Sequence, residues 1–452
     1  MMKKKSLIDD YLKNYSVGKN WEFRANGVGD ISQVVVIPAY AEKEYLFHTL
    51  ASLAKNNPSD REQSLILCVV NNRADASGDV KENNRQTMEC LGALVGQKSI
   101  SGFAGDRALH PLLAIVADAG MKLGYVDASS PEREMPASTG GVGMARKIGM
   151  DIALTLLRDM EGVAKVIVSL DADTLVRENY LSVIRHHFQS DARTAIVAYE
   201  HQLPQDPRHQ AAIICYEIFL RYWILGLKFA RSPWAFHTIG STIAVSPDAY
   251  LQVRGMNKRE AGEDFYFLNK LAKIGSIDCL QETRVYPSAR ASLRVPFGTG
   301  KRIQRFLDGG CPDEYCLYDP RVFSVLGEWL QLAGNMFFGR GEEVLEKAGQ
   351  IHPRLNAFLM ENNFLIFWSK IHRTAKDKKT LARHFHDWFD GFKTLKMIHD
   401  LTRDVYPQIN MFDALEKMAD HPGFAGLNFS RERDVPPLPE QLAILRRLRG
   451  IT

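Results

Sequence analysis

The sequence predicts an α/β fold, with a mostly parallel sheet flanked by helices and a mainly helical C-terminal region. Three apolar, β-branched runs at residues 34–37, 64–70 and 166–168 are typical of buried strands. Between the first two runs, residues 45–53 follow a helical period. Apolar strands joined through a helix form a βαβ unit, which is the building block of a parallel sheet.

Two further apolar runs, at residues 112–117 and 123–127, follow an expected loop at residues 96–110. We expect one or both runs to be strands of the same sheet. Beyond about residue 312 the pattern becomes mostly helical. The expected helices cover residues 323–338, 342–349, 356–372, 380–404, 412–419 and 440–449. The predicted organisation is an N-terminal extension (1–30), a sheet domain (31–312) and a helical C-terminal region (313–452).

Composition indicates an ordinary globular protein. The chain has 452 residues, of which 45% are hydrophobic and 24% charged, enough for a large core. A net charge of +4 gives no signal for nucleic-acid binding. The six cysteines form no paired C-x-x-C motif, so a zinc site is not expected. The most lipid-like window, residues 211–230, contains three charged residues. We therefore expect a cytoplasmic protein without spanning helices.

Two carboxylates follow the strand at residues 166–168. Side chains alternate along a strand, so Asp171 and Asp173 would share one face if the extended geometry persists. Two carboxylate ligands suit Mn²⁺ or Mg²⁺, whose other ligands are commonly waters and substrate phosphates. The alternative is a solvated pair of aspartates in a turn at the end of the strand.

Polar side chains also follow the two earlier strands. Residues 40–42 end the first strand, and Asn71 and Asn72 end the second. Ligands of parallel sheets bind beyond the carboxyl ends of the strands. We therefore expect these residues and residues 171–173 to line one crevice.

Six segments, in this order, resemble the motifs of family 2 glycosyltransferases, which have the Rossmann-like GT-A fold. They are residues 34–42, 141–149, 169–174, 240–246, 253–256 and 262–267. The resemblance implies transfer of a sugar from a nucleotide-diphosphate sugar to an acceptor hydroxyl, with inversion. Because we expect no spanning helices, we also expect one transfer per encounter. Lys147 departs from the pattern because the family often has Asn there, and Asn71 and Asn72 stand where it usually has Asp.

The resemblance also implies roles for individual residues. Asp264 would be the catalytic base, with Glu263 beside it in the catalytic pair. Residues expected to contact the nucleotide sugar are Pro38, Tyr40, Glu42, Asn71, Asn72, Arg146, Asp171, Arg302 and Arg305. Residues expected to hold Mn²⁺ or Mg²⁺ are Asp171, Asp173 and His237. A UDP-sugar is the favoured donor and a GDP-sugar the alternative; the acceptor stays open.

Simpler interpretations remain for several of these residues. Glu263 and Asp264 could cap a helix N-terminus, and Arg302 and Arg305 could form a basic helix face. A basic, aromatic stretch at residues 370–403 fits a membrane surface, an acidic acceptor or an amphipathic helix with a solvated basic face. The alternative functions are a nucleotidyltransferase and a non-catalytic sugar-nucleotide-binding protein. A dehydrogenase is not expected, because no G-x-G-x-x-G motif follows a strand.

Overall fold

The computed structural model describes residues 2–17, 20–96, 107–158, 164–292, 294, 298–337, 339–375, 377–419 and 433–452, without the side chains of 2–6 and 310–312. The predicted loop at 96–110 lies mostly outside these residues. The chain forms two compact units. The sheet unit comprises Met1–Gln202 and Thr238–Ser288, and the helical unit comprises Leu203–His237 and Ala289–Thr452. The domain limits expected at residues 30 and 312 stay a prediction.

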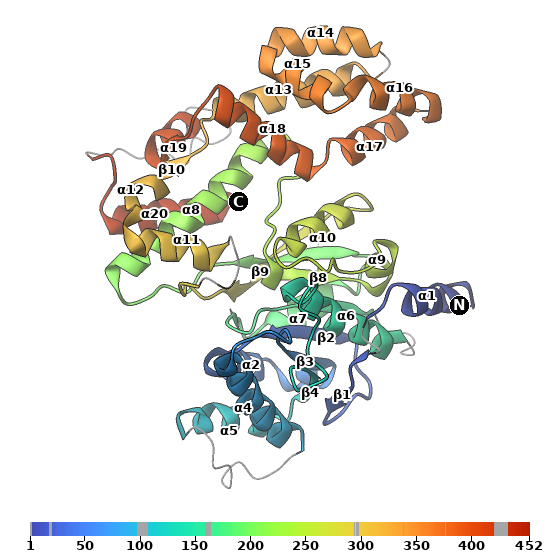
Figure 1. Ribbon diagram of the computed structural model, residues 1–452, viewed down its shortest axis with the longest axis vertical. Coiled ribbons are helices and arrows are strands. Elements are labelled where there is room, and N and C mark those ends of the chain that lie inside the picture. Colours follow the sequence, from blue (N-terminus) through green and yellow to red (C-terminus); the bar gives the residue numbers. More distant parts are fainter. Residues whose placement is uncertain are drawn as a thin grey trace. The chain divides into compact units, whose positions relative to one another are not determined.

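In the described part of the sheet unit, nine strands form one sheet (Figure 1). Their order across the sheet is β1 (Phe23–Ala25), β4 (Lys122–Ala128), β3 (Ser64–Asn71), β2 (Gln33–Ala39), β5 (Val166–Ser169), β8 (Ile243–Val245), β7 (Thr194–Tyr199), β9 (Asp278–Tyr286) and β6 (Leu175–Val176). The longer ladders, β2 with β3, β3 with β4, β2 with β5, and β7 with β9, are parallel. Strands β1, β6 and β8 pair only antiparallel. The predicted α/β class is confirmed.

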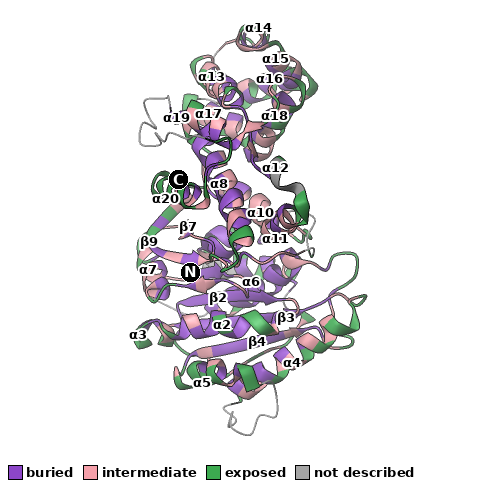
Figure 2. Ribbon diagram, turned by 90° about the vertical axis from the view of Figure 1, so that its left-hand side faces the viewer, coloured by how far each residue is buried: buried purple, intermediate pink, exposed green. Residues whose placement is uncertain are grey.

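The central strands are the apolar runs identified in the sequence. Every residue of β2, β3 and β5 is buried, and Figure 2 shows β2 and β3 among the buried elements of this unit. Continuous apolar runs are typical of parallel strands covered on both faces. The two faces are therefore covered by helices.

Nine α-helices are described in the sheet unit. They are α1 (Met2–Asn14), α2 (Lys43–Ala54), α3 (Pro58–Glu62), α4 (Gly78–Val95), α5 (His110–Asp118), α6 (Val142–Arg158), α7 (Tyr180–His187), α9 (Pro247–Gln252) and α10 (Glu263–Ala272). Helices α2, α4 and α5 contact one another, whereas α6 packs on β2, β3 and β5 together with α1 and α10. Because crossovers are right-handed and the strand order reverses between β2 and β5, α6 covers the opposite face. The reversal creates a topological switch point, where open sheets bind ligands.

Of the two apolar runs, of which we expected one or both to be strands, one is a strand and the other is a helix. Residues 123–127 lie in β4, but residues 112–117 lie in α5. Leu113 and Val116 are buried while Ile115 is 43% exposed, which is the one-sided burial of a helix. Pro111 in the first turn also suits a helix start.

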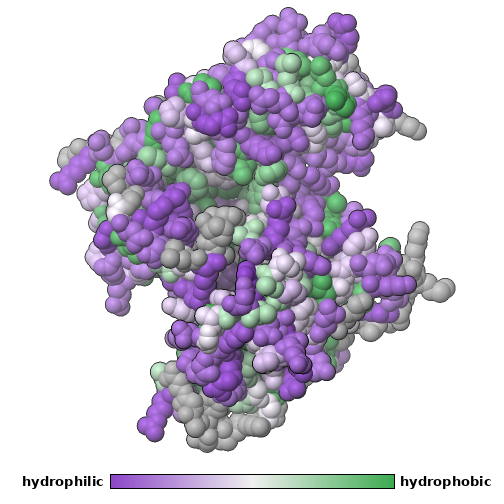
Figure 3. Space-filling model, in the orientation of Figure 1, coloured by the Kyte–Doolittle hydropathy of each residue, from purple (hydrophilic) through white to green (hydrophobic). Residues whose placement is uncertain are grey.

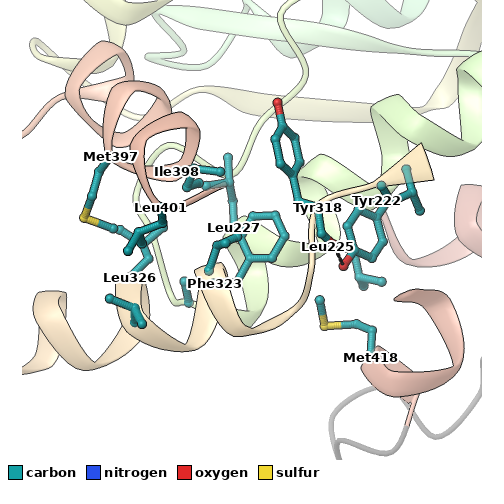
Figure 4. Packing of buried hydrophobic residues seen from close by; sticks show 14 of the residues in the cluster. Tyr222, Leu225, Leu227, Tyr318, Phe323, Leu326, Met397, Ile398, Leu401 and Met418 are labelled. Atoms are coloured by element: carbon teal, nitrogen blue, oxygen red, sulfur yellow. Dashed lines mark hydrogen bonds between the residues drawn. The ribbon is translucent and has the colours of Figure 1, made fainter. Parts of the chain in front are cut away.

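The helical unit consists mainly of short helices. They are α8 (Pro207–Phe229), α11 (Thr299–Arg305), α12 (Cys311–Glu314), α13 (Arg321–Asn335), α14 (Gly341–Ile351), α15 (Pro353–Glu361), α16 (Phe364–Thr374), α17 (Lys378–Trp388), α18 (Gly391–Asp404), α19 (Met411–Ala419) and α20 (Leu438–Ile451). A short two-stranded antiparallel sheet pairs β10 (Cys316–Leu317) with β11 (Ile409–Asn410). Figure 4 shows Leu227 of α8, Phe323 of α13 and Leu401 of α18 in one apolar core. In the same core the Tyr222 hydroxyl donates to the Tyr318 carbonyl at 2.7 Å.

Two helices expected to be continuous are each divided. The expected helix at 356–372 is interrupted at Asn363, which is left-handed with φ of 58°. The expected helix at 380–404 is interrupted at Asp390, whose side chain accepts from the Phe392 and Lys393 N–H groups. Asparagine tolerates the left-handed region, and aspartate is a favoured helix cap. These residues therefore end one helix and begin the next.

Helix α8 is the segment with the most lipid-like sequence, and it belongs to the helical unit. Its Glu217 is buried and bonds to Arg221 and to Arg449 of α20, both at 2.8 Å. Among the described residues, we found no helix with the length and apolarity required to cross a membrane.

Candidate functional site

Asp171 and Asp173 lie in a turn directly after β5. The Thr174 N–H donates to the Asp171 carbonyl at 3.1 Å, so the extended geometry that we expected ends at Asp171. Exposure nevertheless alternates: Leu170, Ala172 and Thr174 are buried, whereas both aspartates are partly exposed. The turn is held by the Thr49 hydroxyl, which donates to the Ala172 carbonyl at 2.8 Å. Both carboxylates therefore remain accessible, although by a different backbone geometry than expected.

Arg146 connects Asp171 to the other predicted carboxylates. It lies in the first part of α6 and is 3% exposed. Its Nη2 donates to Asp171 Oδ1 at 2.6 Å, and its Nε donates to Glu263 Oε1 at 3.0 Å. Burial lowers the pKa of Arg146, but the charges of Asp171, Glu263 and Asp264 outweigh burial and raise it. The guanidinium is thus a fixed positive charge between segments that are far apart in sequence.

Two motif glycines make room for this arrangement. A side chain at Gly240 would place its Cβ 2.2 Å from Arg146 Nη2, and the Gly240 carbonyl accepts from Arg146 Nη1 at 3.3 Å. A Cβ at Gly143 would lie 2.4 Å from the Arg259 carbonyl oxygen. Only glycine allows such close approach of backbone to a neighbouring group. The glycines therefore position the arginine.

Asp264 lies in the first turn of α10, next to Glu263. Its Oδ1 accepts from the Phe265 N–H at 2.7 Å, but the cap position is Gly262, so Glu263 and Asp264 are the first residues of the helix and not its cap. Burial, followed by the nearby Glu263 carboxylate, raises the pKa of Asp264 to about 7. A carboxyl group with such a pKa can exchange a proton near neutral pH, as a general base must.

Asn84, which the sequence analysis did not single out, joins the ends of β2 and β3. Its Oδ1 accepts from the Ala41 N–H at 2.9 Å. Its Nδ2 donates to the Asn71 carbonyl at 3.0 Å and to Asn72 Oδ1 at 2.8 Å. Ala41 has a φ of 51°, which is unusual for a residue with a side chain. Asn84 therefore fixes the loop that carries Tyr40 and Glu42 relative to the asparagines.

Five residues predicted to contact the sugar nucleotide lie at or near the ends of β2 and β3. Pro38 pairs in register with Val69 inside the sheet, so it is part of β2. Tyr40 follows that strand, and Glu42 is the residue before α2. Asn71 is the last residue of β3, and Asn71 and Asn72 are both buried. Strands β2, β3 and β5 are parallel neighbours, so these residues and Asp171 follow the same edge of the sheet.

The remaining predicted site residues belong to the helical unit. Arg302 and Arg305 both form ion pairs with the buried carboxylate of Glu314, Arg302 at 2.6 Å. The Arg302 guanidinium also lies over the Phe219 ring, 4.5 Å from its centre. This pairing accounts for the two cations within their own unit. His237 is buried in the same unit, and its role as a metal ligand stays a prediction.

The donor set fits a hard divalent cation held partly by substrate. The described residues contain no group of three or more His, Cys, Asp or Glu side chains that could hold a metal. Asp171, however, bonds to Arg146 through Oδ1 and has a side chain that is 34% exposed. Mg²⁺ and Mn²⁺ commonly use one or two carboxylates, with waters and phosphates completing the shell. Asp171 and Asp173 match that type of site.

A second buried network on α6 contains Lys147, the residue after Arg146, and Asp151. Asp151 Oδ1 accepts from the hydroxyls of Tyr11 at 2.7 Å and Tyr250 at 2.8 Å, and Oδ2 accepts from the Val17 N–H at 2.8 Å. Lys147 Nζ lies 3.2 Å from Asp151 Oδ2. Burial lowers the pKa of Lys147, and the charge of Asp151 opposes that effect. Lys147, which departs from the family pattern, is thus paired with a carboxylate on its own helix.

Comparisons with known proteins gave weak matches only. No protein-family model and no curated protein matches this chain. The crystal structure of S. aureus TarS 1–349 in complex with UDP-GlcNAc has a TM-score of 0.35 at 14% identity, covering 93% of this chain and 90% of that chain. The mannosyltransferase PcManGT from Pyrobaculum calidifontis, in complex with GDP-Man and Mn²⁺, has a TM-score of 0.33 at 12% identity, covering 99% and 93%. Scores this low assign neither a fold nor an activity to this chain.

Proposed function

We propose that this protein is a glycosyltransferase of the family 2 type, which transfers a sugar from a nucleotide-diphosphate sugar to an acceptor hydroxyl. The observation that supports this most is the position of Arg146. It bonds to Asp171 and Glu263, next to Asp264, and so brings three of the segments with family 2-like motifs into contact. Burial and the charge of Glu263 raise the pKa of Asp264 to about 7, which suits a general base.

The residues divide into acceptor and donor functions. Asp264 would take the proton from the attacking hydroxyl, and Glu263 would hold Arg146 in place and tune the pKa of Asp264. Asp171 and Asp173 would hold Mn²⁺ or Mg²⁺, which stabilises the negative charge of a leaving diphosphate when bound. Arg146 fixes the Asp171 carboxylate at that position.

For the donor, we propose a UDP-sugar, with a GDP-sugar as the alternative. Asn71 and Asn72 can accept a hydrogen bond from a base through the amide oxygen and can also donate through the amide nitrogen. The Asn72 amide is already used: its Oδ1 accepts from Asn84, and its Nδ2 donates to the Arg73 carbonyl at 3.0 Å. Asn71 is therefore the better candidate for contact with a base. We propose one sugar transfer per encounter.

The test is the Asp264→Asn variant. The amide keeps the shape of the side chain but cannot take up a proton at neutral pH, so transfer should fall by about 10²–10⁴-fold. A panel of UDP- and GDP-sugars, screened by thermal shift with and without Mn²⁺, identifies the donor. Transfer of its labelled sugar to an extract of the source cells then measures activity.

Asp118→Asn, on exposed α5, is the matched control and should retain full transfer. Calorimetry should give Asp264→Asn the same donor affinity as the wild type. Transfer by the variant within about tenfold of the wild type would exclude Asp264 as the base. Donor binding without transfer by the wild type in any extract would favour a non-catalytic binding protein.

A further inference from the structure

Three large apolar side chains are exposed at one corner of the helical unit. Met360, Leu365 and Ile366 are 61%, 37% and 71% exposed. Met360 lies in the last turn of α15 and the other two lie in the first turn of α16. The tight turn between the helices is closed by the Asn363 N–H, which donates to the Met360 carbonyl at 3.0 Å. Figure 3 shows hydrophobic surface gathered over α15 and α16. We call these three residues the apolar corner.

The same face of α16 continues as a basic surface. Lys370 and Arg373 are exposed and follow Ile366 at spacings of four and seven residues, which places them on its side of the helix. Helix α17, which packs on α16, adds the exposed Lys378 and Lys379. Among the described residues, none of these four cations forms an ion pair. We call these four residues the basic rim.

Two aromatic residues of the basic, aromatic stretch at residues 370–403 do not contribute to a membrane surface. Phe385 and Phe389 are buried and stack on each other with ring centres 5.9 Å apart. Trp329 of α13 packs against both of them. These rings belong to the core of the helical unit, whereas the large apolar side chains exposed at this corner lie on α15 and at the start of α16.

We propose that the apolar corner and the basic rim together bind the surface of an anionic lipid bilayer. Exposed apolar side chains beside cations match the two layers of such a surface, because the former enter the acyl boundary and the latter bind headgroup phosphates. A symmetric pair of chains joined at this corner would bring basic rims together, which like-charge repulsion opposes. Binding to a soluble polyanion would leave the exposed side chain of Ile366 in water. The proposal concerns a surface of the helical unit and does not depend on sugar transfer.

The test is sedimentation of the full chain with vesicles of phosphatidylcholine alone or in an equimolar mixture with phosphatidylglycerol. We expect binding to the anionic vesicles only, weakening as salt rises. Lys378→Ala with Lys379→Ala should weaken binding by on the order of 25-fold, at about fivefold per cation. Met360→Ser with Ile366→Ser should weaken it by about tenfold or more, while circular dichroism stays unchanged because the side chains are exposed.

Matched controls lie in the sheet unit. Ile115→Ser removes an apolar side chain that is also exposed, and Lys55→Ala removes an exposed cation; both should bind like the wild type. Equal binding to neutral and anionic vesicles, or no effect of either double variant, would refute the proposal. So would a serine variant that changes the mass in light scattering, which would indicate a second copy of the chain. Heparin binding that displaces vesicles but ignores the serine substitutions would indicate a soluble polyanion instead.

Discussion

Arg146 is a single buried cation that balances several carboxylates. Arg146 donates to the carboxylates of Asp171 and Glu263, whereas the Asp264 carboxylate accepts from a backbone N–H. Glu263 is therefore held as an ion-paired, buried anion, and it opposes a second negative charge on its neighbour. The result is one carboxyl group that changes protonation near neutral pH.

The Glu263→Gln substitution tests this electrostatic coupling. The charge of Glu263 raises the pKa of Asp264, so a neutral amide should lower that pKa from about 7. The base must be deprotonated, hence kcat/KM should rise with pH through a limb that lies at lower pH in the variant than in the wild type. The pH profile of kcat/KM measures this shift.

Glu260→Gln is the matched control, because Glu260 is an exposed carboxylate that pairs with Arg73 at the surface. This substitution should leave the rising limb of the kcat/KM pH profile at the wild-type pH. A limb that stays at the wild-type pH in Glu263→Gln, or moves to higher pH, would contradict the coupling between the two carboxylates.

At the scale of elements, α1 is attached to the sheet unit through Asp151. That carboxylate accepts from Tyr11 of α1, Tyr250 of α9 and the Val17 N–H, and it pairs with Lys147 on its own helix. Because Asp151 and Lys147 are both buried, neither charge can be compensated by water. The network holds α6, and Arg146 lies on the same helix.

Asp151→Asn should therefore destabilise the protein by about 3–5 kcal/mol, the usual effect of leaving one buried charge without its partner. Equilibrium unfolding in urea measures the loss. Lys147→Met restores charge balance and, combined with Asp151→Asn, should recover part of it. A loss no larger than that of the surface variant Asp118→Asn would show that the network carries little stability.

Much of the arrangement of elements follows from the sequence, because apolar β-branched runs become buried strands wherever helices cover both faces. The strands at 34–37, 64–70 and 166–168 were predicted for this reason and are confirmed. The run at 112–117 is equally apolar, so its length and composition do not distinguish a short helix from a strand. One-sided burial, which decides the matter, becomes visible only when the neighbouring helices are in place.

The candidate site was predictable in its residue types but not in its internal bonds. Asp171, Glu263 and Asp264 were identified from motifs, whereas the bonds of Asp171 and Glu263 to the same arginine depend on pairing across the sheet unit. Asn84 lies in the middle of an ordinary polar helix, and no pattern in α4 distinguishes it. Its importance comes from the left-handed backbone at Ala41, which a sequence does not reveal.

At the scale of the whole molecule, the predicted site residues divide between two compact units. The carboxylates, Arg146 and the asparagines belong to the sheet unit, and Arg302, Arg305 and His237 belong to the helical unit. The two arginines already have an internal partner in Glu314. The proposed base and the two aspartates proposed to hold the metal therefore belong to the sheet unit, whereas the third predicted ligand, His237, belongs to the helical unit.

The carboxylates of the candidate site lead to a prediction about stereochemistry. A retaining mechanism through a covalent intermediate needs a carboxylate that is free to attack the sugar, in addition to an acid or base. Glu263 is buried and bound to Arg146, and Asp171 bonds to the same guanidinium, so Asp264 is the carboxylate suited to proton transfer. A single base assists direct attack by the acceptor, and direct displacement inverts the anomeric carbon.

We expect an α-linked donor to give a β-linked product, as the anomeric coupling in the proton NMR spectrum of the first-formed product would show. An α-linked first product, or a labelled sugar trapped on the protein in the absence of acceptor, would contradict direct displacement.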